Sequence, residues 1–390
     1  LAEVNLGYNG SEQFAKGHRF GFFPAFSVGW IVSNENFLKD NRFLTKLKLR
    51  ASYGKVGNDN LGSARFLYLD DIQLTGGNST VHMPSLGNNQ YIQIKKKGNP
   101  NIGWEIAYKQ NYGVDFTILG NDLSISLDYF RENRDNILIS RQTIPELQGL
   151  PLSTLPKVNM GKITNQGFEI DASYYKGISK DFSVTVTGNF GYNRNKINYI
   201  DEVSYPTGDQ PDGSKGYAYQ YRQTGFSIGQ CWGYERDYSN GNGFINTPEE
   251  LAWANEAYQI GKARIGDFLY KDVNDDGVIS EKDMVPMGYG TIPRITYGFG
   301  ANLRYRQFDL SFQFAGVGQV SGTYSGYGTT EHGLTGFYTK QHLNAYTPER
   351  YAAGEKIEYP ALSYSVTASH TANDYFIMDR SFLRLKNLEL

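Results

Sequence analysis

The fold class of this chain is decided by the stretch from Tyr297 to Phe314, which reads YGFGANLRY, RQ, FDLSFQF. From Tyr297 to Tyr305 every second side chain is apolar, and the residues between them are Gly, Asn and Arg. After Arg306-Gln307 the apolar residues again alternate, now with Asp, Ser and Gln. A period of two puts the two sets on opposite faces of a strand, and two such runs joined by a minimal turn form an amphipathic hairpin. The pattern recurs along the chain and predicts a sheet with one apolar and one polar face, as the wall of a membrane barrel requires.

Composition agrees with this interpretation once alternation is taken into account. The 390 residues include 30 Tyr, 23 Phe and 44 Gly, and the mean hydropathy is −0.50. A negative mean is typical of soluble proteins, but in barrel strands the polar half of each strand averages away the apolar half. No run approaches the ~18 apolar residues of a spanning helix, which excludes a helical membrane protein.

Charge and cysteine content narrow the possible partners. The formal charge is −2, so there is no basic excess that would attract nucleic acid, and Lys95-Lys96-Lys97 fits a solvated loop. Cys231 is alone, which excludes an intrachain disulfide. The chain starts at Leu1 without an initiator Met or a signal peptide, and it ends in a strand pattern from Phe382 to Leu390. We therefore expect a fragment, with sequence missing at both ends.

Strand patterns cover much of the chain. The clear ones are Arg19–Val32, Thr45–Gly54, Gly103–Leu119, Asp122–Asn133, Lys162–Lys176, Asp181–Asn193, Arg294–Tyr305, Gln307–Gly316 and Phe382–Leu390. Weaker ones are Ser63–Leu69, Tyr91–Lys95 and Tyr217–Tyr234.

The connections between these segments alternate between short and long. Short ones lie at residues 120–121, 177–180 and 306–307, and long ones at 58–101, 134–161, 194–293 and 317–381. An up-and-down meander with this alternation places all short turns at one end and all long loops at the other. The predicted fold is all-β, part of a large antiparallel transmembrane β-barrel with long extracellular loops. A soluble β-sandwich or propeller is the alternative, and loops of such unequal length argue against it.

The connection 194–293 is too long to lack structure of its own. Thr247-Pro248-Glu249-Glu250 supplies an N-cap hydroxyl, Pro at the first helical position and Glu three residues after the cap. We therefore expect a short helix that ends near Gln259.

The same connection contains an acidic loop, Asp272 to Asp283, with the spacing of a calcium site. Gly277 stands where such a loop turns sharply. The expected oxygen ligands are Asp272, Asn274, Asp276, the Val278 carbonyl, Ser280 and Asp283. The last is Asp where the usual loop has Glu, and an Asx-rich turn without metal remains the alternative. A bound Ca²⁺ would brace the long loop.

Residues that could support catalysis do not form a recognisable pattern. The histidines are scattered without zinc-ligand spacing, at His18, His82, His332, His342 and His370. No phosphate-binding glycine loop follows a strand. We therefore expect no enzyme activity and no catalytic residues.

Several segments, in their order along the chain, resemble the SusC/RagA-like TonB-linked outer-membrane transporters of Bacteroidetes. They are Phe26–Trp30, Leu47–Gly54, Gly57-Asn58, Asn99–Glu105, Asn165–Glu169, Gly266–Gly277 and Arg380–Asn387. Together these segments span nearly the whole chain.

The resemblance implies a 22-stranded barrel in the outer membrane of a Gram-negative bacterium, of which this chain would supply about half, from the C-terminal portion. It also implies a SusD-like lipoprotein lid, energy from TonB, and oligosaccharide or peptide cargo. The family's plug domain and TonB-contacting segment have no counterpart in this chain. The first functional hypothesis is active import. The alternative is a calcium-braced outer-membrane surface binding or adhesion protein without transport.

Overall fold

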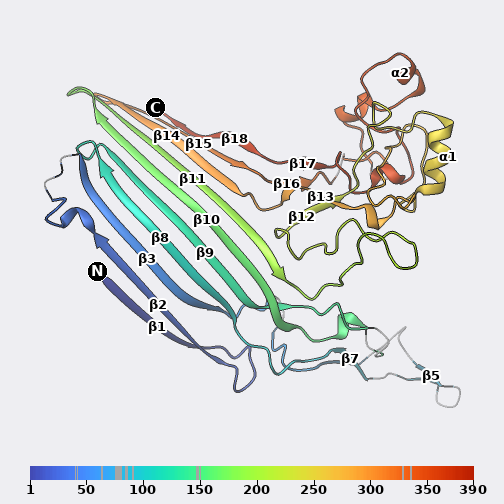
Figure 1. Ribbon diagram of the computed structural model, residues 1–390, viewed down its shortest axis with the longest axis horizontal. Coiled ribbons are helices and arrows are strands. Elements are labelled where there is room, and N and C mark those ends of the chain that lie inside the picture. The colour runs from blue at the N-terminus through green and yellow to red at the C-terminus, as the bar shows by residue number, and fades with distance from the viewer. Residues whose placement is uncertain are drawn as a thin grey trace.

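Ten antiparallel strands form one continuous sheet in the computed structural model (Figure 1). The structure describes residues 1–39, 41, 43–62, 65–74, 81–83, 87–89, 92–145, 149, 151–326, 329–333 and 336–390. The wall strands are β1 (Ala2–Gly10), β2 (Phe20–Ile31), β3 (Leu44–Asn58), β8 (Glu105–Ile118), β9 (Leu123–Ile139), β10 (Val158–Gly177), β11 (Phe182–Tyr199), β14 (Ile295–Tyr305), β15 (Phe308–Gly318) and β18 (Phe382–Glu389). Each pairs with the next wall strand along the chain, so the sheet is an up-and-down meander. We call this sheet the wall.

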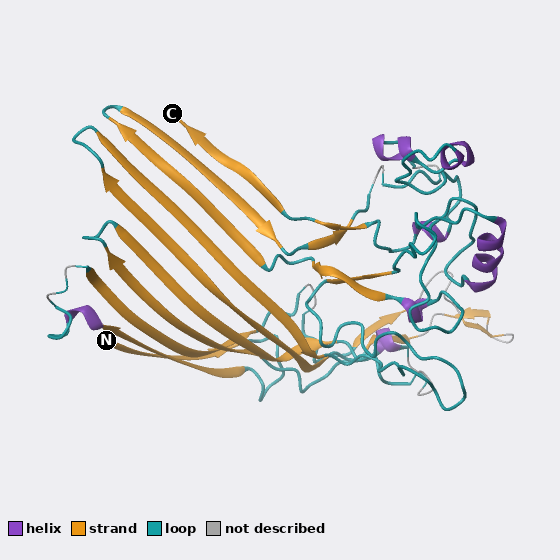
Figure 2. Cartoon of the chain, turned by 45° about the horizontal axis from the view of Figure 1, so that its top comes forward, coloured by secondary structure: helices purple, strands orange, loops and turns teal. Residues whose placement is uncertain are grey.

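The two ends of the wall differ sharply. Figures 1 and 2 show short turns at one end and long excursions at the other. Arg306 and Gln307 alone join β14 to β15, and Arg306 adopts a positive φ of 54° to close this turn. The Arg306 backbone N–H donates to the carbonyl of Asp181 at 2.8 Å, which ties this turn to its neighbour. The predicted meander, with its unequal ends, is confirmed.

Strand register aligns the apolar residues into rows across the wall. One row runs through seven strands, from Trp30 through Leu49, Val114, Leu127, Ile170 and Phe190 to Tyr297. Many large apolar side chains on this face are exposed, among them Val28 at 57% and Phe299 at 44%. A face this apolar without a covering layer fits contact with lipid rather than a soluble core.

Smaller elements lie at the long-loop end. They are the strands β4 (Asp71–Leu74), β5 (Val81–Met83), β6 (Gly87–Asn89), β7 (Ile92–Lys96), β12 (Gln230–Gly233), β13 (Val285–Gly290), β16 (Ser321–Thr323) and β17 (Ile377–Asp379), the helices α1 (Pro248–Ala257) and α2 (Pro348–Ala352), and short 3-10 turns. Helix α1 begins where the sequence predicts it. Thr247 accepts from the Glu250 N–H, and the Glu250 carboxylate accepts from the Thr247 N–H, so the capping box is complete.

Residues 200–294 pack against the described parts of 319–381 (319–326, 329–333 and 336–381) to form what we call the loop unit. Its core includes Phe244, Phe268, Tyr270, Ile279 and Tyr359, each at most 2% exposed. Burying a side chain of this size stabilises by about 2 kcal/mol, so the unit has a hydrophobic core separate from the wall. The sequence shows two long connections but not that they fold together.

Several strand expectations differ from the structure. β1 was not among the predicted strands, although it pairs along its length with β2. The described part of Ser63–Leu69 contains no strand, and only Gln230–Gly233 of the weak segment Tyr217–Tyr234 is one. No helix in the described ranges combines the length and apolar character needed to cross a membrane.

Candidate functional site

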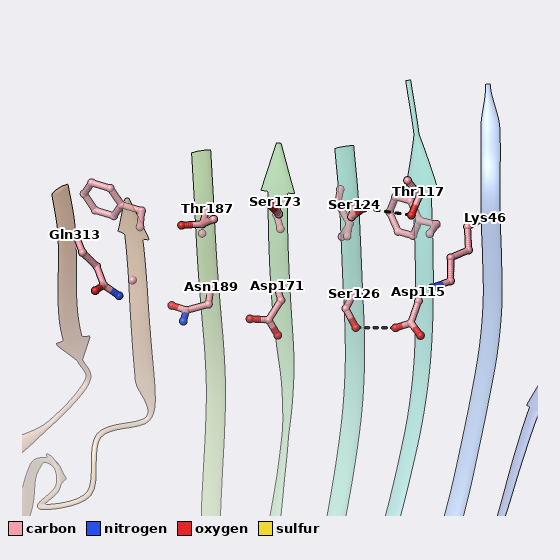
Figure 3. Close-up of a pocket in the computed structure, with 16 residues that line it drawn as sticks. Lys46, Asp115, Thr117, Ser124, Ser126, Asp171, Ser173, Thr187, Asn189 and Gln313 are labelled. Carbon is pink, nitrogen blue, oxygen red and sulfur yellow. Dashed lines mark hydrogen bonds between the residues drawn. The ribbon is translucent and has the colours of Figure 1, made fainter. Parts of the chain in front are cut away.

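The face of the wall opposite the apolar rows is lined by polar side chains in register. One row runs from Lys46 through Thr117, Ser124 and Ser173 to Thr187. Figure 3 shows a second row beside it, which includes Asp115, Ser126, Asp171 and Asn189. Alternation requires this arrangement, because the residues between the apolar ones must point the other way. The result is a hydrophilic surface that follows the strands.

Arg50 connects three strands on this polar face. Its guanidinium donates to both carboxylate oxygens of Asp115 at 2.9–3.1 Å and to those of Asp128 at 2.7 and 2.9 Å. Ser126 donates to Asp115 at 2.8 Å. Gly113 lies beneath the guanidinium, since a Cβ there would come within 2.6 Å of the Arg50 Cζ. Bidentate pairing of one cation with two carboxylates holds these side chains in fixed positions.

The two polar rows border a hollow of about 440 Å³. Its polar lining includes Lys46, Asp115, Asp171, Thr187 and Gln313, from five different strands (Figure 3). Hydroxyl, amide and carboxylate groups alternate along it, and Thr117 and Ser124 bond to each other at 3.2 Å. This surface can exchange hydrogen bonds with a hydrophilic solute or a protein segment. It shows no nucleophile paired with a base.

The acidic loop brings its first three predicted ligands together. Asp272 accepts from the N–H groups of Asp276 and Gly277, and the Asn274 side chain donates to Asp276 at 3.1 Å. Asp276 in turn accepts from the N–H of Val278 at 2.9 Å. Asp275 and Gly277 adopt positive φ values of 57° and 79°, so the chain turns sharply where the spacing predicts it.

The remaining predicted ligands close the loop. Asp283 is fully buried and accepts from the N–H groups of Val273 and Ser280, at 2.9 and 2.8 Å. Burial raises the pKa of Asp283, and these hydrogen bonds only partly offset it. The Ser280 hydroxyl accepts from the Lys282 N–H, and the Lys282 ammonium lies 3.5 Å from Asp276. Among the described residues, no three His, Cys, Asp or Glu side chains gather as metal ligands.

Comparison with known proteins identifies the family. The model of the TonB dependent receptor-like beta-barrel matches residues 3–347. The chain belongs to this family. Its members are outer-membrane proteins, so the sheet is part of a barrel wall in that membrane. The expected β-barrel fold class, the resemblance and the location are thereby confirmed, whereas the expected count of 22 strands stays a prediction.

Individual relatives agree. The chain is 29% identical to TonB-dependent receptor P3 of Formosa agariphila, over 97% of this chain and 35% of that protein. It is 27% identical to TonB-dependent receptor SusC of Bacteroides thetaiotaomicron, over 100% of this chain and 36% of SusC. The solved RagAB peptide transporter superposes with a TM-score of 0.71 at 20% identity, covering 99% of this chain and 38% of that one, and shows the shared fold. The chain thus spans little more than a third of the length of its relatives.

Sequence reasoning did not identify the Arg50 cluster. A signal was present, because Lys46, Lys48 and Arg50 occupy successive polar-face positions opposite Leu47 and Leu49. Which carboxylates they meet depends on pairing with distant strands, and the alternation of one strand does not contain that information.

Proposed function

We propose that the whole protein imports oligosaccharides or peptides across the outer membrane, with energy from TonB and with a SusD-like surface lipoprotein as partner. The observation that supports this is the wall, a single sheet with lipid-compatible rows on one face and hydrophilic rows on the other. Since the chain covers 35–36% of its curated relatives, this activity belongs to the whole protein. The relatives are named as receptors, which also favours a non-enzymatic role.

The loop unit suits a partner at the long-loop end, which faces outward in this proposal. It exposes large apolar side chains, including Tyr338 at 73%, Leu343 at 70% and Tyr364 at 72%. Exposed apolar groups of this size are typical of protein interaction surfaces, and a lipoprotein lid would cover them.

The import proposal can be tested in cells of the source bacterium. Cells grown on tryptone plus a starch hydrolysate are compared with strains that lack this protein, TonB or the SusD-like lipoprotein. Mass spectrometry of the medium then records which solutes are consumed. We expect one class of oligosaccharide or peptide to remain in the medium in all three deletion strains. Unchanged consumption without this protein or without TonB contradicts import and favours a surface binding or adhesion role.

We also propose that the acidic loop binds Ca²⁺ through Asp272, Asn274, Asp276, the Val278 carbonyl, Ser280 and Asp283. Oxygen-only ligands on a loop suit this ion. A cation would compensate the buried carboxylate of Asp283. The acidic loop connects Tyr270, in the loop-unit core, to β13. A bound cation would therefore also restrain the position of β13 relative to this core.

Calorimetric Ca²⁺ titration of the detergent-purified whole protein tests this site. The double variant D272A/D276A should show no heat of Ca²⁺ binding. Its loop unit should be cleaved faster in limited proteolysis than that of the wild type, while the wall stays folded. D275N is the matched control, because it removes one acidic charge from the same loop at a position that is not a predicted ligand. Equal Ca²⁺ binding by the wild type and the double variant would remove the metal proposal.

A further inference from the structure

A second hollow, of about 800 Å³, lies where the loop unit joins the wall. Strand β13 of the sheet β12–β13 and both strands of the sheet β16–β17 border it, together with the segment 235–239. β13 leads into β14, β16 follows β15, and β17 leads into β18, so the hollow lies directly beyond the ends of three wall strands (Figure 1). Its volume falls in the range of ligand-binding cavities, roughly 300–1,000 Å³.

The floor and rim of this hollow have different character. Met287 and Ser321 are buried at the floor, and the Ser321 hydroxyl accepts from the Tyr289 N–H at 3.0 Å. Tyr238 and Tyr289 are 51% and 36% exposed. A guanidinium already lies over each ring, with Arg236 at 5.2 Å from the ring centre of Tyr238 and Arg294 at 5.0 Å from that of Tyr289. Both aromatic rings beside this cavity thus already take part in cation–π contacts within the chain.

The charges of the lining are unbalanced. Four carboxylates, from Glu235, Asp237, Asp374 and Asp379, face two cations, Arg236 and Lys271, which gives 2 − 4 = −2. The lining therefore carries a net negative charge and favours a cationic ligand.

Arg236, one of these two cations, already has partners within the chain. Arg236 donates to Asp374 at 2.6 Å, and its guanidinium lies 4.9–5.6 Å from the ring centres of Tyr238, Phe268 and Tyr375. Its side chain is only 15% exposed. This arginine is therefore poorly placed to receive an anion, whereas Lys271 is exposed and lies 3.9 Å from Glu235.

Asp237 and Asp379 lack cationic partners among the described contacts. Asp237 accepts from the Ser239 N–H, and Asp379 accepts from the N–H and hydroxyl of Ser381. These turn contacts use one oxygen of each carboxylate, and the second oxygen remains able to accept. An amine that enters the hollow would find carboxylate acceptors from two different segments of the lining.

We propose that this hollow is a binding subsite for short cationic peptides, which it would recognise through their amino groups. The inference deepens the import function proposed above and rests on it. Neutral sugars would leave the carboxylates unpaired, and acidic glycans would be repelled by them.

Isothermal titration calorimetry of the detergent-purified whole protein tests the subsite. Because TonB is absent, the experiment measures binding of a ligand to the hollow and does not depend on import. The probes are trilysine, triglutamate and maltohexaose. Trilysine should bind more tightly than the other two. The variant D237N/D379N keeps the turn-forming oxygens and removes two charges, and we expect it to weaken trilysine binding about tenfold.

The matched control is D181N/D309N, which removes two carboxylates at the short-turn end of the wall and should bind trilysine like the wild type. Equal trilysine affinity in the hollow variant and the wild type would overturn the proposal. So would tighter binding of triglutamate or maltohexaose than of trilysine. In either case the uptake experiment above still decides whether the protein imports solutes.

Discussion

Glu331 illustrates how single residues stabilise the loop unit. Its carboxylate accepts from the Tyr359 hydroxyl at 2.7 Å and from the Ser363 N–H at 2.6 Å, and His370 Nε2 lies 3.4 Å away. Burial by itself would raise the pKa of Glu331, but the hydrogen bonds outweigh it and bring the pKa from 4.5 to about 2. The ring of His332 packs 4.6 Å from that of His370, so protonatable groups surround this carboxylate.

The lowered pKa predicts acid sensitivity of the loop unit. A carboxylate whose pKa falls on folding contributes stability that is complete above its ordinary pKa and is lost as the pH drops. Thermal melts followed by near-UV circular dichroism should therefore show the loop unit weakening between about pH 4.5 and pH 2. E331Q should be less stable at pH 7, by about 1.5–3 kcal/mol, and less pH-dependent in this window. E256Q, at an exposed position of α1, is the control. Parallel pH profiles of E331Q and the wild type would contradict the prediction that Glu331 causes the acid sensitivity of the loop unit.

Residue patterns in the sequence predict local geometry better than distant contacts. The acidic loop and the Thr247 cap follow from spacing, because each involves neighbours within one turn or loop. Arg50 meets Asp115 and Asp128, which are 65 and 78 residues away, and Glu331 meets His370 across 39 residues. Such contacts depend on strand register and loop packing, which no local pattern encodes.

At the scale of elements, strand β10 offers a direct test of the two faces. Ile170 lies in the apolar row between Leu127 and Phe190, whereas Ser173 lies in the polar row between Ser124 and Thr187. Arg on the lipid face of a barrel costs about 2–4 kcal/mol near the bilayer midplane. I170R should therefore destabilise the wall by about that much, measured by urea unfolding of the whole protein in lipid vesicles. S173R should change the free energy of unfolding by about 0.5 kcal/mol or less. If the two variants lower it equally, the lipid-facing and polar faces are assigned wrongly.

The elements that the sequence predicted are those with long, uninterrupted alternation. β1 carries the same signal at Val4, Leu6 and Tyr8, but Asn5, Gly7 and Asn9 between them also favour turns, and pairing with β2 decides the outcome. The segment Tyr217–Tyr234 is aromatic enough to suggest a strand. Instead, the guanidinium of Arg222 in this segment lies 5.0–5.6 Å from three ring centres, those of Tyr217 and Trp232 of the same segment and that of Tyr205.

At the scale of the whole molecule, the wall and the loop unit are stabilised by different interactions. The wall depends on hydrogen bonds between paired strands and on the contact of its apolar face with lipid. The loop unit depends on an ordinary buried core and on polar groups such as Glu331 and Asp283. The sequence predicts the wall because its periodicity repeats. The loop unit is assembled from two connections separated by a hairpin, and nothing periodic links them.

This difference predicts two separate unfolding transitions for the whole protein in detergent. Differential scanning calorimetry should resolve a lower-temperature transition of the loop unit and a higher one of the wall, because each has its own set of stabilising contacts. Acidification to pH 3 should lower only the first transition, as should EGTA through removal of the Ca²⁺ that we propose for the acidic loop, whereas I170R should lower only the second. E256Q should leave both in place. A single transition that moves as one under all these changes would show that the loop unit and the wall unfold as one cooperative structure.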